Sequence, residues 1–122
     1  MLAGKYSFAI EQGQDWARRI AWYDSTPTIK NLSAGWTATL KIRYYPGDVG
    51  TALLTITQAD EITLATGVAG YNIILKLTAA VTAALTFQRG YYTLELIETV
   101  EEVVTSYRVL EGEMFVLKEC TN

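Results

Sequence analysis

The chain has 122 residues, of which 50% are hydrophobic and 19% are charged. This composition indicates one globular domain with a sizeable core and excludes a disordered or collagen-like protein. Its 10 basic and 13 acidic residues give a net charge of −3, which argues against binding nucleic acid through the phosphate backbone. The chain has no histidine, which excludes the commonest general base and the commonest zinc ligand, and its single cysteine excludes an internal disulfide.

Alternating apolar and polar residues predict short β-strands in the N-terminal half of the chain. Arg18 and Arg19 are adjacent in one of these strands, so they project to opposite faces, and we expect one of them at the margin of a sheet. Trp22 and Trp36 alternate with other large apolar residues and are therefore assigned to the core. The strands expected in this half cover residues 6–11, 16–23 and 36–44.

The same alternation predicts further strands in the C-terminal half. In one of them Ile73 and Leu75 should face inward and Asn72 outward. Gly112 lies inside the last strand, where a glycine marks a bulge or a close backbone approach. The alanine-rich segment 78–85 is expected to form a short helical crossover with Thr78 as its cap. The strands expected here cover residues 52–57, 62–65, 71–77, 91–97 and 105–118.

Strands at roughly 8–12-residue spacing with turn residues between them are typical of a β-sandwich. We therefore predict an all-β protein, an antiparallel immunoglobulin-like sandwich of about seven or eight strands with one short helical crossover. No repeat or linker interrupts the chain, so residues 1–122 are expected to form one domain with a core over about 6–117. The N-terminal segment lacks the pattern of a secretory signal, and no apolar run is long enough to span a bilayer, so no membrane partner is expected.

Carboxylates are the acid–base groups that remain in quantity. Glu111 and Glu113 lie two residues apart on the last strand, a spacing that could support glycoside hydrolysis. We favour instead a solvated turn and a charged sheet edge that blocks strand addition, and we predict that the protein is not an enzyme and needs no cofactor or metal. A second group of glutamates gathers around a predicted turn before the last strand, at Glu95, Glu98, Glu101 and Glu102.

Paired tyrosines are the second set of candidate residues. Tyr44 with Tyr45 and Tyr91 with Tyr92 lie near strand ends, and one member of each pair must point outward because adjacent strand residues face opposite sides. Exposed aromatic rings can anchor protein interfaces or stack on sugars, whereas ordinary packing at the rim of the core explains them as well. These four tyrosines, together with Glu98, Glu101 and Glu102, are our interface candidates.

Several blocks of the sequence resemble small β-sandwich virion proteins that tailed bacteriophages encode among their tail, baseplate and fibre genes. The resemblance covers about residues 6–117 and consists of turns, core aromatics and strand register. It departs from the family at Glu98–Val103, where relatives carry a short glycine-containing turn and this chain has an acidic stretch that we expect to be a longer loop. The similar blocks are Gln12–Trp16, Trp22–Asp24, Pro27–Arg43, Ile62–Leu64, Ile73–Leu85, Gly90–Leu96 and Tyr107–Val116.

The resemblance implies a non-enzymatic structural protein of a phage particle. Its partners would be other tail, baseplate, fibre or capsid proteins, it would form a homo-oligomer within the particle, and it would be made and assembled in the host cytoplasm before residing in the virion. The family has no catalytic residues to transfer. A capsid-decorating (cement) protein and a glycan-binding β-sandwich module remain the alternatives.

Overall fold

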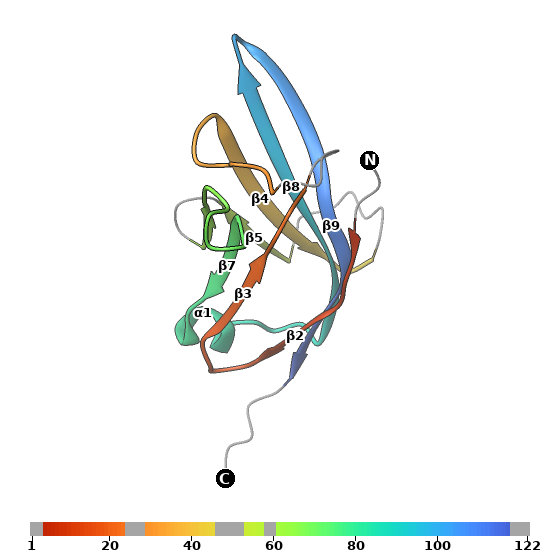
Figure 1. Cartoon of the computed structure of the whole chain (residues 1–122). Helices are drawn as coiled ribbons and strands as arrows, with labels where there is room; N and C mark the ends of the chain where they lie inside the picture. Colours follow the sequence, from red (N-terminus) through yellow and green to blue (C-terminus); the bar gives the residue numbers. More distant parts are fainter. Residues whose placement is uncertain (1–3, 24–28, 46–52, 58–60, 118–122) are drawn as a thin grey trace.

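The computed structural model describes residues 4–23, 29–45, 53–57 and 61–117, and these ranges form nine strands and one short helix (Figure 1). An all-β fold is thereby confirmed. The turn residues Asp24 and Pro27 of the phage-like blocks lie outside these ranges. The elements are β1 (Gly4–Lys5), β2 (Phe8–Glu11), β3 (Trp16–Ile20), β4 (Trp36–Arg43), β5 (Leu54–Thr57), β6 (Ile62–Leu64), β7 (Ile73–Leu77), α1 (Ala79–Ala83), β8 (Arg89–Val100) and β9 (Val103–Leu117).

The alternation in the sequence places the strands as expected. In β4, burial alternates residue by residue, and Trp36, Leu40 and Ile42 lie in the core. The Thr78 hydroxyl accepts a hydrogen bond from the Val81 N–H at the start of α1, which confirms the predicted cap. Local pattern therefore determines the position and the buried face of these elements.

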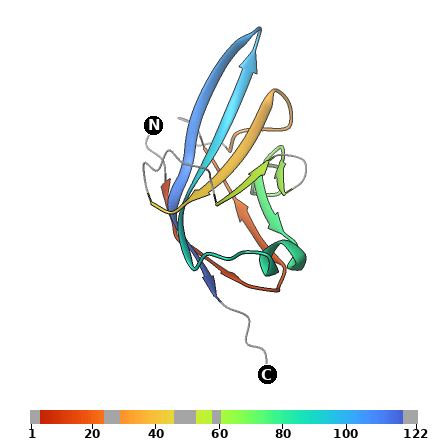
Figure 2. The ribbon, with the colours of Figure 1, turned by 180° about the vertical axis from the view of Figure 1, so that it is seen from behind.

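The strands form two sheets (Figures 1 and 2). The larger sheet has the order β1-β9-β8-β4-β5, and β2 also pairs with β9; the smaller sheet has the order β3-β7-β6. Both β1 and β2 run parallel to β9, with Gly4 opposite Leu110 and Phe8 opposite Met114. The prediction of a wholly antiparallel arrangement is therefore wrong for these pairs. The first strands pair with the last strand of the chain, and the local alternation of residues does not predict pairing between segments so far apart in the sequence.

Gly112 allows the start of the chain to approach β9. A Cβ atom on Gly112 would overlap with the carbonyl oxygen of Tyr6, between β1 and β2. The Tyr92 hydroxyl, on the strand at the other side of β9, donates a hydrogen bond to the same oxygen at 2.6 Å. The close approach predicted at Gly112 is confirmed, whereas the irregularity in β9 lies elsewhere, where Leu94 pairs with Leu110 and the next residue, Glu95, pairs with Arg108.

A buried asparagine joins the smaller sheet to the segment that follows β3. Asn72 is fully buried, so the prediction that it faces outward is wrong. Its side chain accepts a hydrogen bond from the Trp22 N–H at 2.8 Å and donates to the carbonyl oxygens of Trp22 and Lys30 at 2.9 and 2.8 Å. A side chain with both a donor and an acceptor can bind all three backbone groups, which an apolar residue could not do.

The hairpin formed by β8 and β9 extends beyond the rest of the molecule, away from the end that carries α1 (Figures 1 and 2). The last residue of β8 that pairs with β4 is Glu98, opposite Trp36. Beyond it the two strands continue to Val100 and Val103, which are joined by a turn of two residues, Glu101 and Glu102. The longer loop expected over residues 98–103 is therefore wrong, because the strand alternation continues to the turn.

Candidate protein interface on the β8–β9 hairpin

The turn at the tip of the hairpin has an uncommon backbone. Glu101 and Glu102 both have positive φ angles, of 49° and 70°. Two-residue hairpin turns of this kind favour Asn-Gly or Asp-Gly, because other residues with a Cβ atom are disfavoured at positive φ. The turn also places two like charges side by side at an exposed tip. The hairpin thus carries a local energetic cost, a feature that is concentrated at functional sites.

The tip exposes apolar side chains on both faces of the hairpin. The exposed fractions are 54% for Val100, 64% for Val103 and 63% for Val104. Val100 and Val103 are paired and share the face of the buried Leu96, while Val104 projects to the opposite face. A cluster of three exposed valines at the end of a projecting element is a surface suited to contact with another protein.

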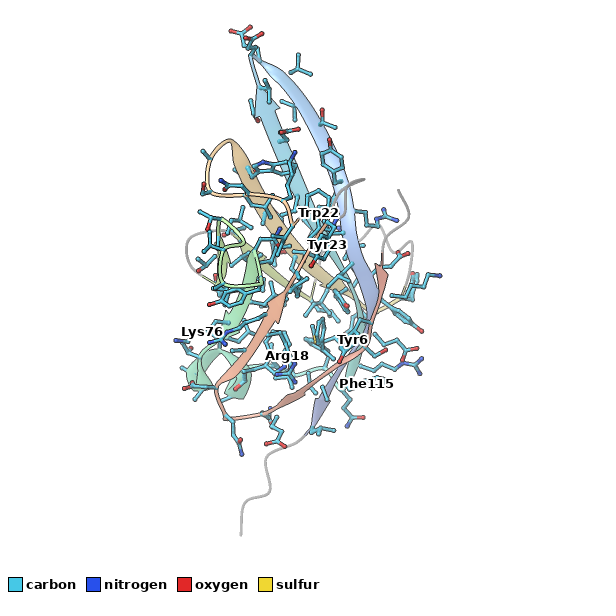
Figure 3. The ribbon with its side chains drawn as sticks, in the orientation of Figure 1. Tyr6, Arg18, Trp22, Tyr23, Lys76 and Phe115 are labelled. Carbon is cyan, nitrogen blue, oxygen red and sulfur yellow. The ribbon has the colours of Figure 1, made fainter. Side chains whose placement is uncertain are left out.

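Aromatic rings hold the base of the hairpin. Trp22, Trp36 and Tyr107 come from three separate segments, and their ring centroids lie 5.5–5.6 Å apart. Figure 3 shows Trp22 in the segment after β3, where the chain reaches the ribbons of the hairpin. Trp22 and Trp36 are buried, as expected. Packing of this kind fixes the direction of the hairpin, since tilted and edge-on ring pairs stabilise the fold beyond their buried area.

The predicted glutamates divide between the tip and the outer face of the sheet. Glu101 and Glu102 form the turn, Glu98 lies two pairs further down from Val100, and all three are on the hairpin as expected. On the outer face, Glu95 accepts a hydrogen bond from the Ser106 hydroxyl at 3.0 Å. The glutamates of the last strand, Glu111 and Glu113, each lie beside an arginine, with Arg108–Glu111 at 3.7 Å and Arg89–Glu113 at 3.0 Å.

The predicted tyrosines lie away from the tip. Tyr44 and Tyr45 are 62% and 58% exposed and follow the C-terminal end of β4. About 23 Å of strand separates this end from Trp36, the β4 residue that pairs with Glu98 near the tip of the hairpin. Tyr91 is half-buried, and its hydroxyl accepts a hydrogen bond from the Arg89 guanidinium at 3.1 Å. Tyr92 is 2% exposed, so it offers no surface to a partner. The seven candidates therefore do not form one surface, and of these seven the three glutamates lie at or near the tip of the hairpin.

Sequence reasoning did not identify the three valines as contact residues. The signal available was the run Val100-Glu101-Glu102-Val103-Val104, in which apolar residues flank a charged pair.

Sequence reasoning also missed an aromatic cluster beside β3, where the Arg18 guanidinium lies 5.1 Å from the Trp16 ring centroid and 6.0 Å from the Phe8 ring centroid. Figure 3 shows Arg18 and Tyr6 on this side of the molecule. Arg18 is exposed at the sheet margin, as one of the two arginines was expected to be.

An apolar groove lies beside α1, at the end of the molecule opposite the hairpin tip. Its volume is about 380 Å³, and its walls include Leu54 of β5, Val81 of α1 and Phe87 of the connection to β8. None of the described residues that line it is charged. The groove is a second exposed apolar feature, separate from the hairpin.

No protein-family model matches this chain, and no curated protein matches its sequence. In the described part of the chain, no helix combines the length and the apolar character that crossing a membrane requires. Within the same ranges, no three His, Cys, Asp or Glu side chains are grouped so that they could hold a metal ion.

Proposed function

We propose that this chain is a non-enzymatic structural protein of a bacteriophage virion, in the tail, baseplate or fibre-attachment region, and that the β8–β9 hairpin is its main contact element. The virion assignment is supported by the sequence resemblance. The contact role is supported by one observation, the projecting hairpin whose tip exposes Val100, Val103 and Val104. Two sheets around one core support an immunoglobulin-like sandwich as the architecture, although the parallel β1 and β2 pairs depart from it.

The exposed valines can supply useful binding energy. Full burial of a valine side chain is worth about 1.5–3 kcal/mol, so three valines that are slightly more than half exposed would add about 3–5 kcal/mol when a partner covers them. The rigid aromatic base reduces the entropy lost on binding, because the hairpin already points in one direction. A preformed apolar tip is thus well suited to fixed contacts in a symmetric assembly.

The proposal is tested with particles of the phage that encodes the chain. Quantitative mass spectrometry of purified virions should detect the protein at a fixed copy number, and the purified protein should cosediment with isolated tails or baseplates. Replacing Val100, Val103 and Val104 by threonine keeps the β-branched shape and should weaken this binding at least about tenfold. Absence from the virion, or unchanged binding by the threonine variant, would refute the proposal.

A matched control uses the exposed tyrosines at the other end of β4. Replacing Tyr44 and Tyr45 by serine removes a similar exposed area but leaves the hairpin intact, so binding to tails should not change. Cosedimentation with isolated capsids in place of tails would indicate the capsid-decorating alternative. The glycan-binding alternative is supported by the exposure of the two adjacent tyrosines, and it predicts a glycan-array signal that the double serine variant loses.

A further inference from the structure

The outer edge of β9 is open along the hairpin. In the described ranges, β1 pairs with β9 only at Leu110 and Glu111, and no strand pairs with residues 103–108 on the side away from β8. An open edge presents a row of N–H and C=O groups that a further strand can bind. This stretch, Val-Val-Thr-Ser-Tyr-Arg, is rich in residues that favour strands and contains neither lysine nor proline, which commonly protect such edges.

The hydrogen bonds of β8 determine which β9 groups are free. The Thr99 N–H donates to the Gly35 carbonyl oxygen on the β4 side at 2.9 Å, so Thr99 and its opposite residue Val104 form a pair without mutual backbone hydrogen bonds. The N–H and C=O of Val104 therefore point away from β8. Strand alternation gives Ser106 and Arg108 the same orientation.

Self-pairing of this edge is possible in few registers. When two identical edges pair antiparallel, outward-pointing residues must lie opposite each other, so the two-fold axis lies at a residue and not between two residues. We compare the three central positions of the stretch, Val104, Thr105 and Ser106. With the axis at Thr105, Val103 lies opposite the partner copy's Tyr107, and the turn residue Glu102 comes next to the partner copy's Arg108. Opposite charges, aromatic with β-branched pairs and threonine pairs are the favourable cross-strand combinations, and this register contains all three.

The other two registers are poorer. An axis at Val104 places Glu102 opposite Ser106, and an axis at Ser106 places Val104 opposite Arg108, so neither pairs the acidic residue with the basic one.

We propose that two copies of this chain form a two-fold dimer by antiparallel pairing of their β9 edges over Val103–Tyr107, with Thr105 on the axis. This inference rests on the proposed role of the hairpin as a contact element and names a second copy of the chain as one partner. The pairing would join the two larger sheets into one and cover Val103 and Val104.

The register is tested by a disulfide. Residues opposite each other in a pair without mutual hydrogen bonds have Cα atoms about 4.5 Å apart, a distance that a disulfide can span. In a variant with the native Cys120 replaced by serine, Thr105→Cys should form a covalent dimer on mild oxidation. The matched control is Thr99→Cys, which is equally exposed but lies on β8. Failure of the Thr105→Cys variant to cross-link, or equal cross-linking of both variants, would overturn the proposal.

The pairing itself is tested by sedimentation velocity over a wide range of protein concentration. Ser106→Pro removes an N–H that the monomer does not use in its ladder and should raise the dimer dissociation constant about tenfold or more. Ser106→Ala removes only the hydroxyl that donates a hydrogen bond to the Glu95 carboxylate, so it should leave the dimer unchanged. A wild-type protein that is monomeric throughout, or a proline variant that dimerises like the alanine variant, would overturn the proposal.

Charge exchange provides a test that does not depend on proline. Glu102→Arg and Arg108→Glu should each weaken the dimer, and the double exchange should restore it. The outcomes also separate this inference from the proposed function. A monomer that binds phage tails through its valines refutes the dimer alone, whereas a dimer sensitive to Ser106→Pro that is absent from virions refutes the virion role alone.

Discussion

Replacing Asn72 by alanine is predicted to destabilise the protein strongly, because three buried or partly buried backbone groups each lose a hydrogen bond. These groups are the N–H and C=O of Trp22 and the C=O of Lys30. The Trp22 C=O still accepts a hydrogen bond from the Lys30 N–H, whereas loss of the bond to the buried Trp22 N–H costs about 1–3 kcal/mol and each of the other two bonds contributes about 0.5–1.5 kcal/mol. The free energy of unfolding should therefore fall by about 2–4 kcal/mol. For a domain of this size, the melting temperature should fall by roughly 10–20 °C.

The assay is urea unfolding followed by tryptophan fluorescence, with hydrogen exchange as a local readout. Asn31→Ala is the matched control, since the Asn31 side chain is exposed and accepts hydrogen bonds from the nearby Ser33. This control should change the free energy of unfolding by no more than about 1 kcal/mol. If Asn72→Ala unfolds within 1 kcal/mol of the native sequence, water or a rearranged backbone must satisfy the three groups, and the reasoning is refuted.

The hairpin should respond to the same variant. Trp22 packs on Trp36 and Tyr107, so loosening the segment that carries Trp22 should increase hydrogen exchange in the upper part of β8 and β9. Exchange at α1 should change less, because the helix is held by its own contacts, including the hydrogen bond from the Ala79 N–H to the Asp15 carboxylate at 2.7 Å. A uniform increase over the whole chain would instead indicate global destabilisation only.

Three further predictions concern the N-terminal strands, the turn and alkaline pH. Gly112→Ala should lower the free energy of unfolding by about 2–3 kcal/mol in denaturant titrations, because the added methyl group overlaps with the Tyr6 carbonyl; a loss below 0.5 kcal/mol would contradict the close approach. Glu101→Asn with Glu102→Gly should raise it by about 1–2 kcal/mol by relieving the positive φ angles, and an unchanged midpoint would show that these angles carry no strain. Burial raises the pKa of Tyr92, so the stability that its neutral hydroxyl contributes is present below the ordinary tyrosine pKa of about 10 and decreases as pH rises above it. Unfolding measured from pH 8 to 11 should show this decline, and Tyr92→Phe should reduce it; an identical slope in both proteins would assign the effect to other groups.

The candidate site was predictable only in part, for reasons visible in individual residues. Glu98, Glu101 and Glu102 were placed correctly near the end of a strand, because a charged pair interrupts an apolar pattern. Their arrangement as a two-residue turn was not predicted, since hairpin turns are recognised by Asn-Gly or Asp-Gly and this chain uses neither. Tyr92 was chosen for its place near a strand end, whereas its burial depends on Tyr6 and Gly112, which reach it from other segments of the chain.

The sequence by itself determined where most strands and the helix lie and which of their faces are buried. Trp36, Leu40 and Ile42 alternate with polar residues, and this spacing is enough to orient β4, because successive side chains of a strand face opposite sides. The tertiary structure alone decided the parallel pairing of β1 and β2 with β9, the projection of the hairpin and the burial of Asn72. Each of these depends on contacts between distant positions, such as the 50 residues between Asn72 and Trp22. Local periodicity carries no information on such contacts, since any strand of suitable pattern can accept the same backbone hydrogen bonds.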